Sequence, residues 1–327
     1  MESFPKFSIV IPVKEVNDYV RETVPYIQSL DLNDWELIIV PNNADQNEWE
    51  DDKRVSLISS GRVGPADKRD QAARIAKGKI LVFLDDDSYP KSDLLSIATT
   101  YFDDDSVSAI GGPAITPESD SYWQKVSGAV FLSKFTGGNP ERYISVGKQK
   151  PIDDWPSVNL MVRRKDFLEV NGFDSPYWPG EDTHFCHKLT KMNRKILYAP
   201  NLIVFHHRRS GFGRHLKQVG AYGIHRGYFA RHMPETSLKI RYLLPSVLTV
   251  MVLIAPILLF TAIKNYVYLG LASYSVVVLM GAIDISKKSS ARVALGALLY
   301  IVPTHLFYGS RFLMGYFKTR PLVSALR

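Results

Sequence analysis

Cysteine is nearly absent from this sequence, since Cys186 is the single one among 327 residues. A lone cysteine cannot form an internal disulfide, so a small disulfide-stapled domain is excluded and a reducing compartment is expected. Internal repeats and low-complexity tracts are also lacking, and 46% of the residues are hydrophobic, which excludes disorder and permits a sizeable core. We therefore expect Cys186 to pack in that core.

Two phosphate-binding motifs are missing as well. No G-x-G-x-x-G follows the first apolar run, and no G-x-x-x-x-G-K-[ST] occurs anywhere in the chain. Both motifs bring glycine backbone close to a phosphate at the start of a helix. Their absence removes the main support for a dinucleotide-dependent oxidoreductase or a P-loop nucleotidase.

Acidic residues are scarce in the last part of the chain. From Leu238 to Arg327 there are ten Lys or Arg and one acid, Asp284, which leaves 30 basic and 32 acidic residues upstream. The net charge of +7 therefore belongs to the C-terminal region. A head without net positive charge speaks against nucleic-acid binding.

The same region holds three apolar windows without a charged residue, each close to the length that crosses a bilayer: Leu243–Ile263, Tyr266–Ile283 and Val293–Ser310. Only Lys264 and Asn265 separate the first two, which predicts a tight helical hairpin. The third contains Pro303 and His305 and is expected to reach about residue 313. It either spans the membrane or lies in the interface, and the second arrangement returns the C-terminus to the cytoplasm.

The N-terminus, Met1–Pro5, lacks a basic segment followed by an apolar one, so no signal peptide is predicted. On that basis the head is expected to remain in the cytoplasm.

In the head, apolar runs alternate with helix-length polar segments. The expected strands are Phe7–Ile11, Trp35–Val40, Val55–Ser59, Ile80–Leu84 and Val107–Gly111, and the expected helices are Val16–Ser29, Pro65–Lys77 and Lys91–Phe102. Continuous β-branched runs suit strands covered on both faces, so an α/β domain with a mostly parallel sheet is predicted. Such sheets bind ligands at the carboxyl ends of their strands.

Three carboxylates, Asp85, Asp86 and Asp87, follow the strongest of these strands. Adjacent acids repel one another unless a cation offsets their charge. A divalent metal carrying a diphosphate is the simplest such cation, because Mg²⁺ or Mn²⁺ prefers carboxylates, water and phosphate oxygens. The alternative is an acidic helix N-terminus, since a helix is expected to follow.

Several motifs in order resemble the family 2 glycosyltransferases with the GT-A fold, over roughly residues 6 to 235. They are Phe7–Pro12, Trp35–Val40, Lys68-Arg69-Asp70 ahead of Ala76-Lys77-Gly78, Phe83–Asp87, Asn171–Asp174, Gly180-Glu181-Asp182 and Val204–Arg208. With its membrane tail the chain most resembles the succinoglycan-type exopolysaccharide transferases. That resemblance implies a prokaryotic plasma-membrane enzyme of surface polysaccharide or glycoconjugate synthesis.

The resemblance also implies site residues. A UDP- or GDP-linked sugar would be bound by residues of the donor pocket, and Mn²⁺ or Mg²⁺ by acids of the aspartate run together with a histidine. The donor residues would be Pro12, Val13, Glu15, Asn42, Lys68, Arg69, Asp85 and Asp86, and the metal ligands Asp85, Asp87 and His206. The adjacent His207 leaves the choice of histidine open.

Asp182 is expected to be the general base of an inverting transfer. The acceptor hydroxyl must lose its proton as it attacks the anomeric carbon, and a carboxylate at a helix start can take that proton. Glu181 either assists this step or caps the same helix.

Two departures from the family's pattern leave the donor open. Pro41-Asn42-Asn43 stands where acidic residues are usual, and no aromatic residue follows Pro12.

The acceptor is expected to meet two later segments. Residues 113 to 156 form a long connection rich in aromatic residues, of which Trp155 is taken as an acceptor contact, with plain packing as its alternative. Residues 208–237 interleave basic and aromatic side chains and read as an interfacial segment, with a solvated basic face as the alternative. Its lipid-binding candidates are Arg208, Arg209, Arg214 and Lys217.

The sequence thus predicts a GT-A domain over residues 1–207, an interfacial segment over 208–237 and a membrane domain over 238–327 with helices near 243–263, 266–283 and 293–313. The predicted function is a membrane-bound, metal-dependent, inverting transfer of one sugar to a polyprenyl-linked glycan. A single sugar is expected because the Gln-x-x-Arg-Trp signature of polymerising relatives is absent. Two alternatives are a polyprenyl-phosphate monosaccharide synthase and a non-catalytic scaffold subunit.

Overall fold

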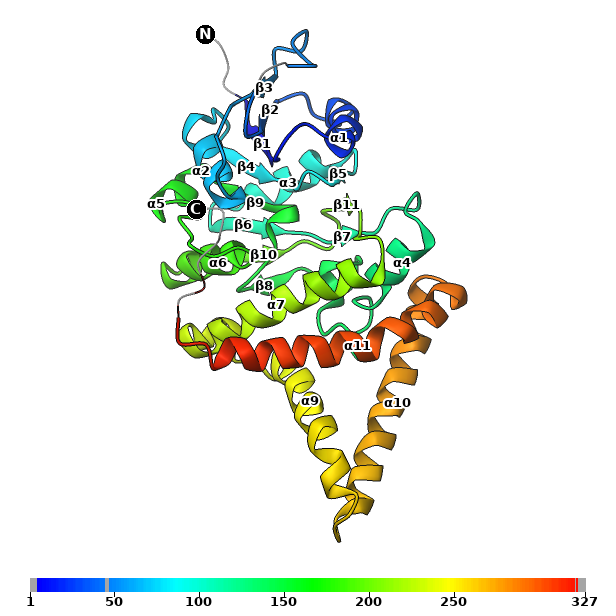
Figure 1. Cartoon of the computed structure of the whole chain (residues 1–327). Helices are drawn as coiled ribbons and strands as arrows, with labels where there is room; N and C mark the ends of the chain where they lie inside the picture. The colour runs from blue at the N-terminus through cyan, green and yellow to red at the C-terminus, as the bar shows by residue number, and fades with distance from the viewer. Residues whose placement is uncertain (1–4, 45–46, 321, 323–327) are drawn as a thin grey trace. The chain divides into compact units, whose positions relative to one another are not determined.

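The computed structural model describes residues 5–44, 47–320 and 322, and the chain divides into two compact units. The first, which we call the sheet unit, holds the described residues up to Ile115 together with Ile144–His206. The second, which we call the helical unit, holds Thr116–Tyr143 together with His207–Leu322. Each unit is described by itself below (Figure 1).

The sheet unit is built on an eight-stranded sheet in the order β3-β2-β1-β4-β9-β6-β10-β8. The strands are β1 Phe7–Pro12, β2 Trp35–Val40, β3 Val55–Leu57, β4 Ile80–Phe83, β6 Val107–Gly111, β8 Lys150–Ile152, β9 Leu160–Arg163 and β10 Lys195–Tyr198. Strands β1 to β4 pair in parallel, as do β6 and β10, whereas β9 and β8 run antiparallel to their neighbours. The predicted mostly parallel α/β sheet is confirmed.

Helices cover both faces of this sheet. They are α1 Asp18–Gln28, α2 Pro65–Ile75, α3 Leu94–Phe102, α5 Arg164–Glu169 and α6 Glu181–Lys191. Ile9 and Ile11 of β1 point into one core with α1 and α3, while Val10 points into the other with α2, α5 and α6. This alternation along one fully buried strand explains its continuous apolar run.

A small second sheet continues from the ends of the large one. Strand β11, Val204–His206, pairs with β5, Ser88–Pro90, on one side and with β7, Ala114–Ile115, on the other. Strand β5 begins directly after the aspartate run, so the second sheet joins that run to the residues of β11.

The helical unit contains α4 Tyr122–Ala129, α7 Phe212–His232, α8 Pro234–Ser237, α9 Ile240–Leu258, α10 Lys264–Lys288 and α11 Ala291–Tyr316. Helices α9, α10 and α11 are long and apolar enough to cross a membrane. The connection between α9 and α10 lies earlier in the chain than predicted. Helix α9 ends at Leu258, and Lys264, which was expected in the connection, is the first residue of α10. Residues 259–263 form the connection, from which α9 and α10 diverge (Figure 1).

Helix α11 differs from the other two apolar helices in its burial. Half of its most apolar window is buried, against 22% for α9 and for α10. It runs parallel to α7, with His215 beside Thr304 near one end and Gly227 beside Phe312 near the other (Figure 1). A methyl group on Gly227 would overlap the Phe312 carbonyl, so glycine is what allows the two backbones to touch.

The segment Thr116–Tyr143 groups with the C-terminal helices, although it lies inside the residue range 1–207 of the predicted catalytic domain. The reason is its apolar face: Val126 and Val130 share a buried cluster with Ile285 of α10 and with Ala297 and Ile301 of α11. The helical unit is therefore made from two separate stretches of chain.

Candidate functional site

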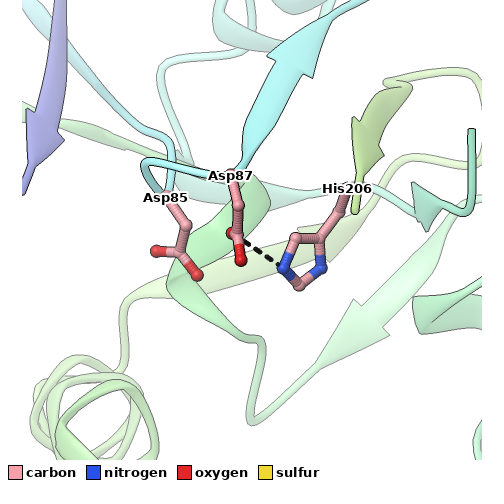
Figure 2. A group of neighbouring side chains, drawn as sticks. All are labelled: Asp85, Asp87 and His206. Carbon is pink, nitrogen blue, oxygen red and sulfur yellow. Dashed lines mark ion pairs between the residues drawn. The ribbon is translucent and has the colours of Figure 1, made fainter. Parts of the chain in front are cut away.

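Strand β4 ends at Phe83, and the aspartates follow in a tight turn that Ser88 closes. The Ser88 hydroxyl accepts a hydrogen bond from the Asp85 N–H at 3.0 Å and lies 2.9 Å from the Asp85 carbonyl oxygen, to which it can donate. Because His206 pairs with Ser88 in the second sheet, its ring comes beside Asp87. Figure 2 shows the His206 Nε2 atom facing the Asp87 carboxylate, at 3.0 Å from Oδ1.

Asp85, Asp87 and His206 fit a divalent cation. One ligand atom from each residue lies within 4.8 Å of the other two. A cation about 2.1 Å from its ligands holds neighbouring ligand atoms about 3 Å apart, the separation of the Asp87 and His206 atoms. Two carboxylates and one imidazole suit Mn²⁺ or Mg²⁺ better than a soft metal.

Asp86 is turned toward a different neighbour. Its Oδ2 accepts a hydrogen bond of 2.8 Å from the side chain of Asn17. The Asn17 side-chain oxygen in turn caps α1 by accepting from the Val20 N–H at 3.0 Å. The start of α1 therefore orients Asp86, which stands apart from the group formed by Asp85, Asp87 and His206.

Arg69, on α2, joins the aspartate turn to the start of α6. Its guanidinium lies 2.6 Å from Asp85 and 3.3 Å from Glu181, and the Arg69 side chain is only 3% exposed. A buried guanidinium with two planar edges can bond two carboxylates at once. Arg69 is thus placed to hold both acids in position.

Glu181 and Asp182 are the first two residues of α6, which begins after Gly180 in the left-handed conformation at φ 116°. Burial and, after it, the neighbouring Asp182 raise the pKa of Glu181 to about 7, although Arg69 acts to lower it. The buried Glu181 therefore holds Arg69, whereas the half-buried Asp182 is the acid of this pair with access to a reactant.

Asp70, the next residue on α2, anchors the loop that leads toward α6. Its carboxylate accepts hydrogen bonds from the N–H groups of Phe173 and Asp174, at 2.7 and 2.8 Å. Positive φ angles at Asn171, Gly172 and Asp174 fold this loop back onto α2. The consecutive residues Arg69 and Asp70 thus fix both α6 and its preceding loop.

Lys68 was expected to bind the donor, but its ammonium group bonds atoms of the protein itself. Its ammonium group is buried and donates to three oxygens: the carbonyls of Val13 and Val40 and the side chain of Asn42. Burial lowers its pKa to about 8. Because an ammonium group has three donors, Lys68 ties together the ends of β1 and β2 and shapes the donor pocket from behind.

The remaining donor candidates lie where β1 ends. Pro12 and Val13 are buried, Asn42 is held by Lys68, and Glu15 is exposed beside Lys14 at 3.9 Å. Of these, Glu15 is the side chain that solvent reaches most freely.

His207 has a partner of its own in the helical unit. Its Nδ1 bonds Asp120, and the other Asp120 oxygen accepts the N–H of Arg208 at 3.0 Å. The cluster of potential metal ligands found in the described part of the chain includes His206 and leaves His207 out. The geometry therefore favours His206, and Asp120 gives His207 a structural role.

Trp155 does not lie where an acceptor contact was expected. Its ring is 1% exposed, packs against Tyr198 and donates to the Gly112 carbonyl at 3.0 Å. This buried position agrees with the alternative that Trp155 packs in the core, because an acceptor cannot reach the ring unless the core opens. Cys186 is buried beside it, as expected.

The basic candidates lie just before α7 and in its first two turns. Arg209, Arg214 and Lys217 are exposed, whereas Arg208 is half-buried over the ring of Tyr143 and bonds Thr116 at 3.0 Å. An anionic surface can reach the first three because they are exposed, whereas Arg208 is partly buried.

Asn17, Asp70 and Asp120 were not assigned from the sequence. Asn17 carried a usable signal, since asparagine before a helix is a common cap. Asp120 carried none, because its partner lies 87 positions away.

Comparison with known proteins identifies the family and the fold. The sequence pattern of Glycosyl transferase family 2 matches residues 8–170, from β1 through the aspartate turn to the end of α5. Glycosyltransferase AglE of Haloferax volcanii is 24% identical over 226 residues, which cover 66% of this chain and 71% of AglE. The GalNAc(5)-diNAcBac-PP-undecaprenol beta-1,3-glucosyltransferase of Campylobacter jejuni is 24% identical over 190 residues, 55% of this chain and 58% of that protein.

Among solved structures, the mannosyltransferase PcManGT from Pyrobaculum calidifontis, in complex with GDP-Man and Mn²⁺, superposes with a TM-score of 0.56. The match covers 93% of this chain and 86% of PcManGT at 14% identity, so it speaks for the fold alone. The predicted GT-A architecture followed by apolar helices is confirmed. On the family pattern and the two relatives, this chain belongs to glycosyl transferase family 2 and is a glycosyltransferase.

Proposed function

We propose that this glycosyltransferase is bound to a membrane and moves one sugar, with inversion, from a nucleotide-sugar donor to a lipid-linked glycan. The observation that carries the proposal is the arrangement of Asp85, Asp87 and His206 on one side of Arg69, with Glu181 and Asp182 on the other. These residues would supply cation ligands and a general base to one site of the sheet unit.

The donor side of this site suits a sugar linked to a nucleoside diphosphate. Asp85, Asp87 and His206 would hold Mn²⁺ or Mg²⁺, which would offset the negative charge of the departing diphosphate. Asn42, fixed by Lys68, presents an amide at the ends of β1 and β2, where a base can be bonded. PcManGT, which shares the fold, binds GDP-Man and Mn²⁺.

The transfer itself is a displacement at the anomeric carbon. The Asp182 carboxylate takes the proton of the acceptor hydroxyl, whose oxygen forms the new bond to carbon. The bond between that carbon and the diphosphate oxygen breaks, and its electron pair leaves with the diphosphate. Arg69 keeps Asp85 in place on the donor side through its bond of 2.6 Å.

The acceptor side points to a lipid. The C. jejuni relative is named for a glycan on undecaprenyl diphosphate, and the helical unit supplies apolar helices of membrane-crossing length. The exposed Arg209, Arg214 and Lys217 suit the phosphates of such a membrane.

Within the helical unit we assign the bilayer spans to α9 and α10. Helix α7 carries exposed charges and is not among the membrane-crossing candidates of the described chain, and α11 follows it in parallel from Thr304 to Phe312. A helix bound along its length to a charged one is expected to lie with it in the interface. This is the second of the two arrangements that the sequence left open, and it brings both ends of the chain to the cytoplasmic side.

The first experiment screens nucleotide sugars for thermal stabilisation of the full chain with Mn²⁺, because a bound donor stabilises the folded state. The selected donor is then tested for transfer to a polyprenyl-diphosphate glycan. Asp182→Asn is expected to retain donor stabilisation and lose transfer. Asp105→Asn is the matched control, since Asp105 is 98% exposed beside Arg163.

Three outcomes would overturn parts of the proposal. Transfer to bare polyprenyl phosphate, giving a charged monosaccharide lipid, would identify a monosaccharide synthase. Unchanged transfer by Asp182→Asn would remove the general base. Stabilisation by no donor at all would favour a scaffold subunit.

A further inference from the structure

The helical unit has a cavity at the C-terminal end of α10. It has a volume of about 470 Å³, and Lys134, Phe135 and Pro140 line its other wall. Phe135, Met280 and Ile283 give it an apolar side, and the last two are 44% and 49% exposed. An apolar surface of this kind at the end of a membrane helix suits a hydrocarbon chain.

The opposite side of the cavity is basic. Lys134, Lys287 and Lys288 line it with one acid, Asp284. Lys288 is already engaged, since it donates to the Leu132 carbonyl at 2.8 Å and to Asp284 at 2.9 Å. This pairing holds Asp284 on α10 and offsets its charge.

Lys134 and Lys287 remain available. Both side chains are exposed, and Lys134 also acts electrostatically on Asp284. Lys134 lies over the ring of Phe135, 5.3 Å from its centre, which keeps the charge at the apolar side of the cavity. Two exposed ammonium groups beside an apolar surface match the chemistry of a phosphate attached to a lipid.

The position of the cavity along α10 agrees with the binding of a lipid phosphate. The uncharged stretch of α10 runs from Tyr266 to Ile283 and is about 27 Å long at about 1.5 Å per residue, close to the thickness of a bilayer's hydrocarbon. Met280 and Ile283 therefore lie in its last turn, and Lys287 lies one turn further, at the level of the headgroups.

We propose that this cavity binds an anionic membrane phospholipid, with its phosphate on Lys134 and Lys287 and an acyl chain along Met280 and Ile283. The inference rests on the membrane attachment proposed above and is independent of the sugar that is transferred. A bilayer lipid is favoured over the acceptor because every lining residue belongs to the helical unit, whereas Asp182 and the candidate metal ligands belong to the sheet unit.

The test is native mass spectrometry of the full chain in detergent, titrated with phosphatidylglycerol and with phosphatidylcholine. Phosphatidylglycerol is expected to bind more tightly, and the double variant Lys134→Gln/Lys287→Gln to bind it about 30-fold more weakly, at about 1 kcal/mol per lysine. Lys264→Gln is the matched control, because it removes a lysine from the opposite end of α10. It is expected to keep the wild-type affinity.

The double variant is expected to unfold close to the wild-type temperature without added lipid, since both lysines are exposed. Equal phosphatidylglycerol affinity in wild type and double variant would overturn the proposal. So would inorganic phosphate that competes at the same concentration as the lipid, or polyprenyl phosphate that binds in preference to phosphatidylglycerol. Sugar transfer is read separately, so its absence with lipid binding intact would remove the proposed function alone.

Discussion

Arg69→Met is expected to destabilise the sheet unit, because it removes the cation shared by two acids. Glu181 is buried and Asp85 is one-third exposed, so the loss falls mainly on Glu181. Breaking a buried ion pair by removing one partner costs about 3 kcal/mol or more. For a unit of this size, that corresponds to a fall of about 6–12 °C in the unfolding temperature.

A double-mutant cycle isolates the pair. Glu181→Gln removes the acid while keeping its shape, and Arg69→Met/Glu181→Gln removes both charges of the buried Arg69–Glu181 pair. Replacing both partners costs less than removing one, so the double variant is expected to be at least as stable as Arg69→Met. The coupling free energy is expected to be about 1 kcal/mol or more.

The pH dependence supplies an independent reading. Burial, with Asp182, raises the pKa of Glu181 from 4.5 to about 7 in the folded protein. The protonated acid therefore favours folding below pH 4.5, and that contribution is lost as the pH rises through about 7. Arg69→Met, which removes a lowering influence, is expected to show a larger deficit at pH 8 than at pH 5.

The assay is thermal unfolding of the four proteins at pH 5 and pH 8. Additive effects of the two single changes would refute the assigned pair. A deficit in Arg69→Met that stays constant with pH would refute the burial of an uncompensated Glu181.

Three further changes test other parts of the molecule. Asp87→Asn is expected to weaken Mn²⁺ binding by calorimetry at least about 10-fold, with Asp105→Asn unchanged. Gly227→Ala is expected to lower the free energy of unfolding by about 1–3 kcal/mol, because its methyl group meets the Phe312 backbone. Gly213→Ala has open space around it and is expected to raise the free energy of unfolding by up to about 1 kcal/mol. Chemical denaturation compares the two variants. Burial lowers the pKa of His215 from 6.5 to about 4, so the unfolding free energy is expected to fall as the pH drops through that range, and His215→Leu to reduce this slope in denaturant titrations. A slope unchanged in that variant would assign the effect to other groups.

The strands of the first half could be read from the sequence because their signal is local. Trp35–Val40 and Val107–Gly111 begin and end where the pattern predicts, since short, mostly apolar runs between turn residues mark buried strands. Strand β9 could not be placed in the same way. It is four residues long and pairs antiparallel between β4 and β6, a choice set by contacts far apart in sequence.

The candidate site was readable in its residue types and less so in their assignments. The aspartate run and His206 follow from strand ends and motif order, but the preference for His206 over His207 depends on Asp120, which no local pattern connects to it. Lys68 looked like a ligand-binding residue because it is basic and lies in a motif. Its three backbone and side-chain acceptors become apparent only when β1 and β2 lie side by side.

The helical unit draws on two stretches of chain, and this limits how the molecule can be divided. Ending the protein at His207 would remove α11 and leave Val126 and Val130 of the first stretch without their apolar partners. A shortened protein of this kind is expected to aggregate rather than act as a free enzyme. Exchanging the helical unit with that of a relative would require replacing both of its stretches of chain at once. The two units are therefore expected to be inherited together.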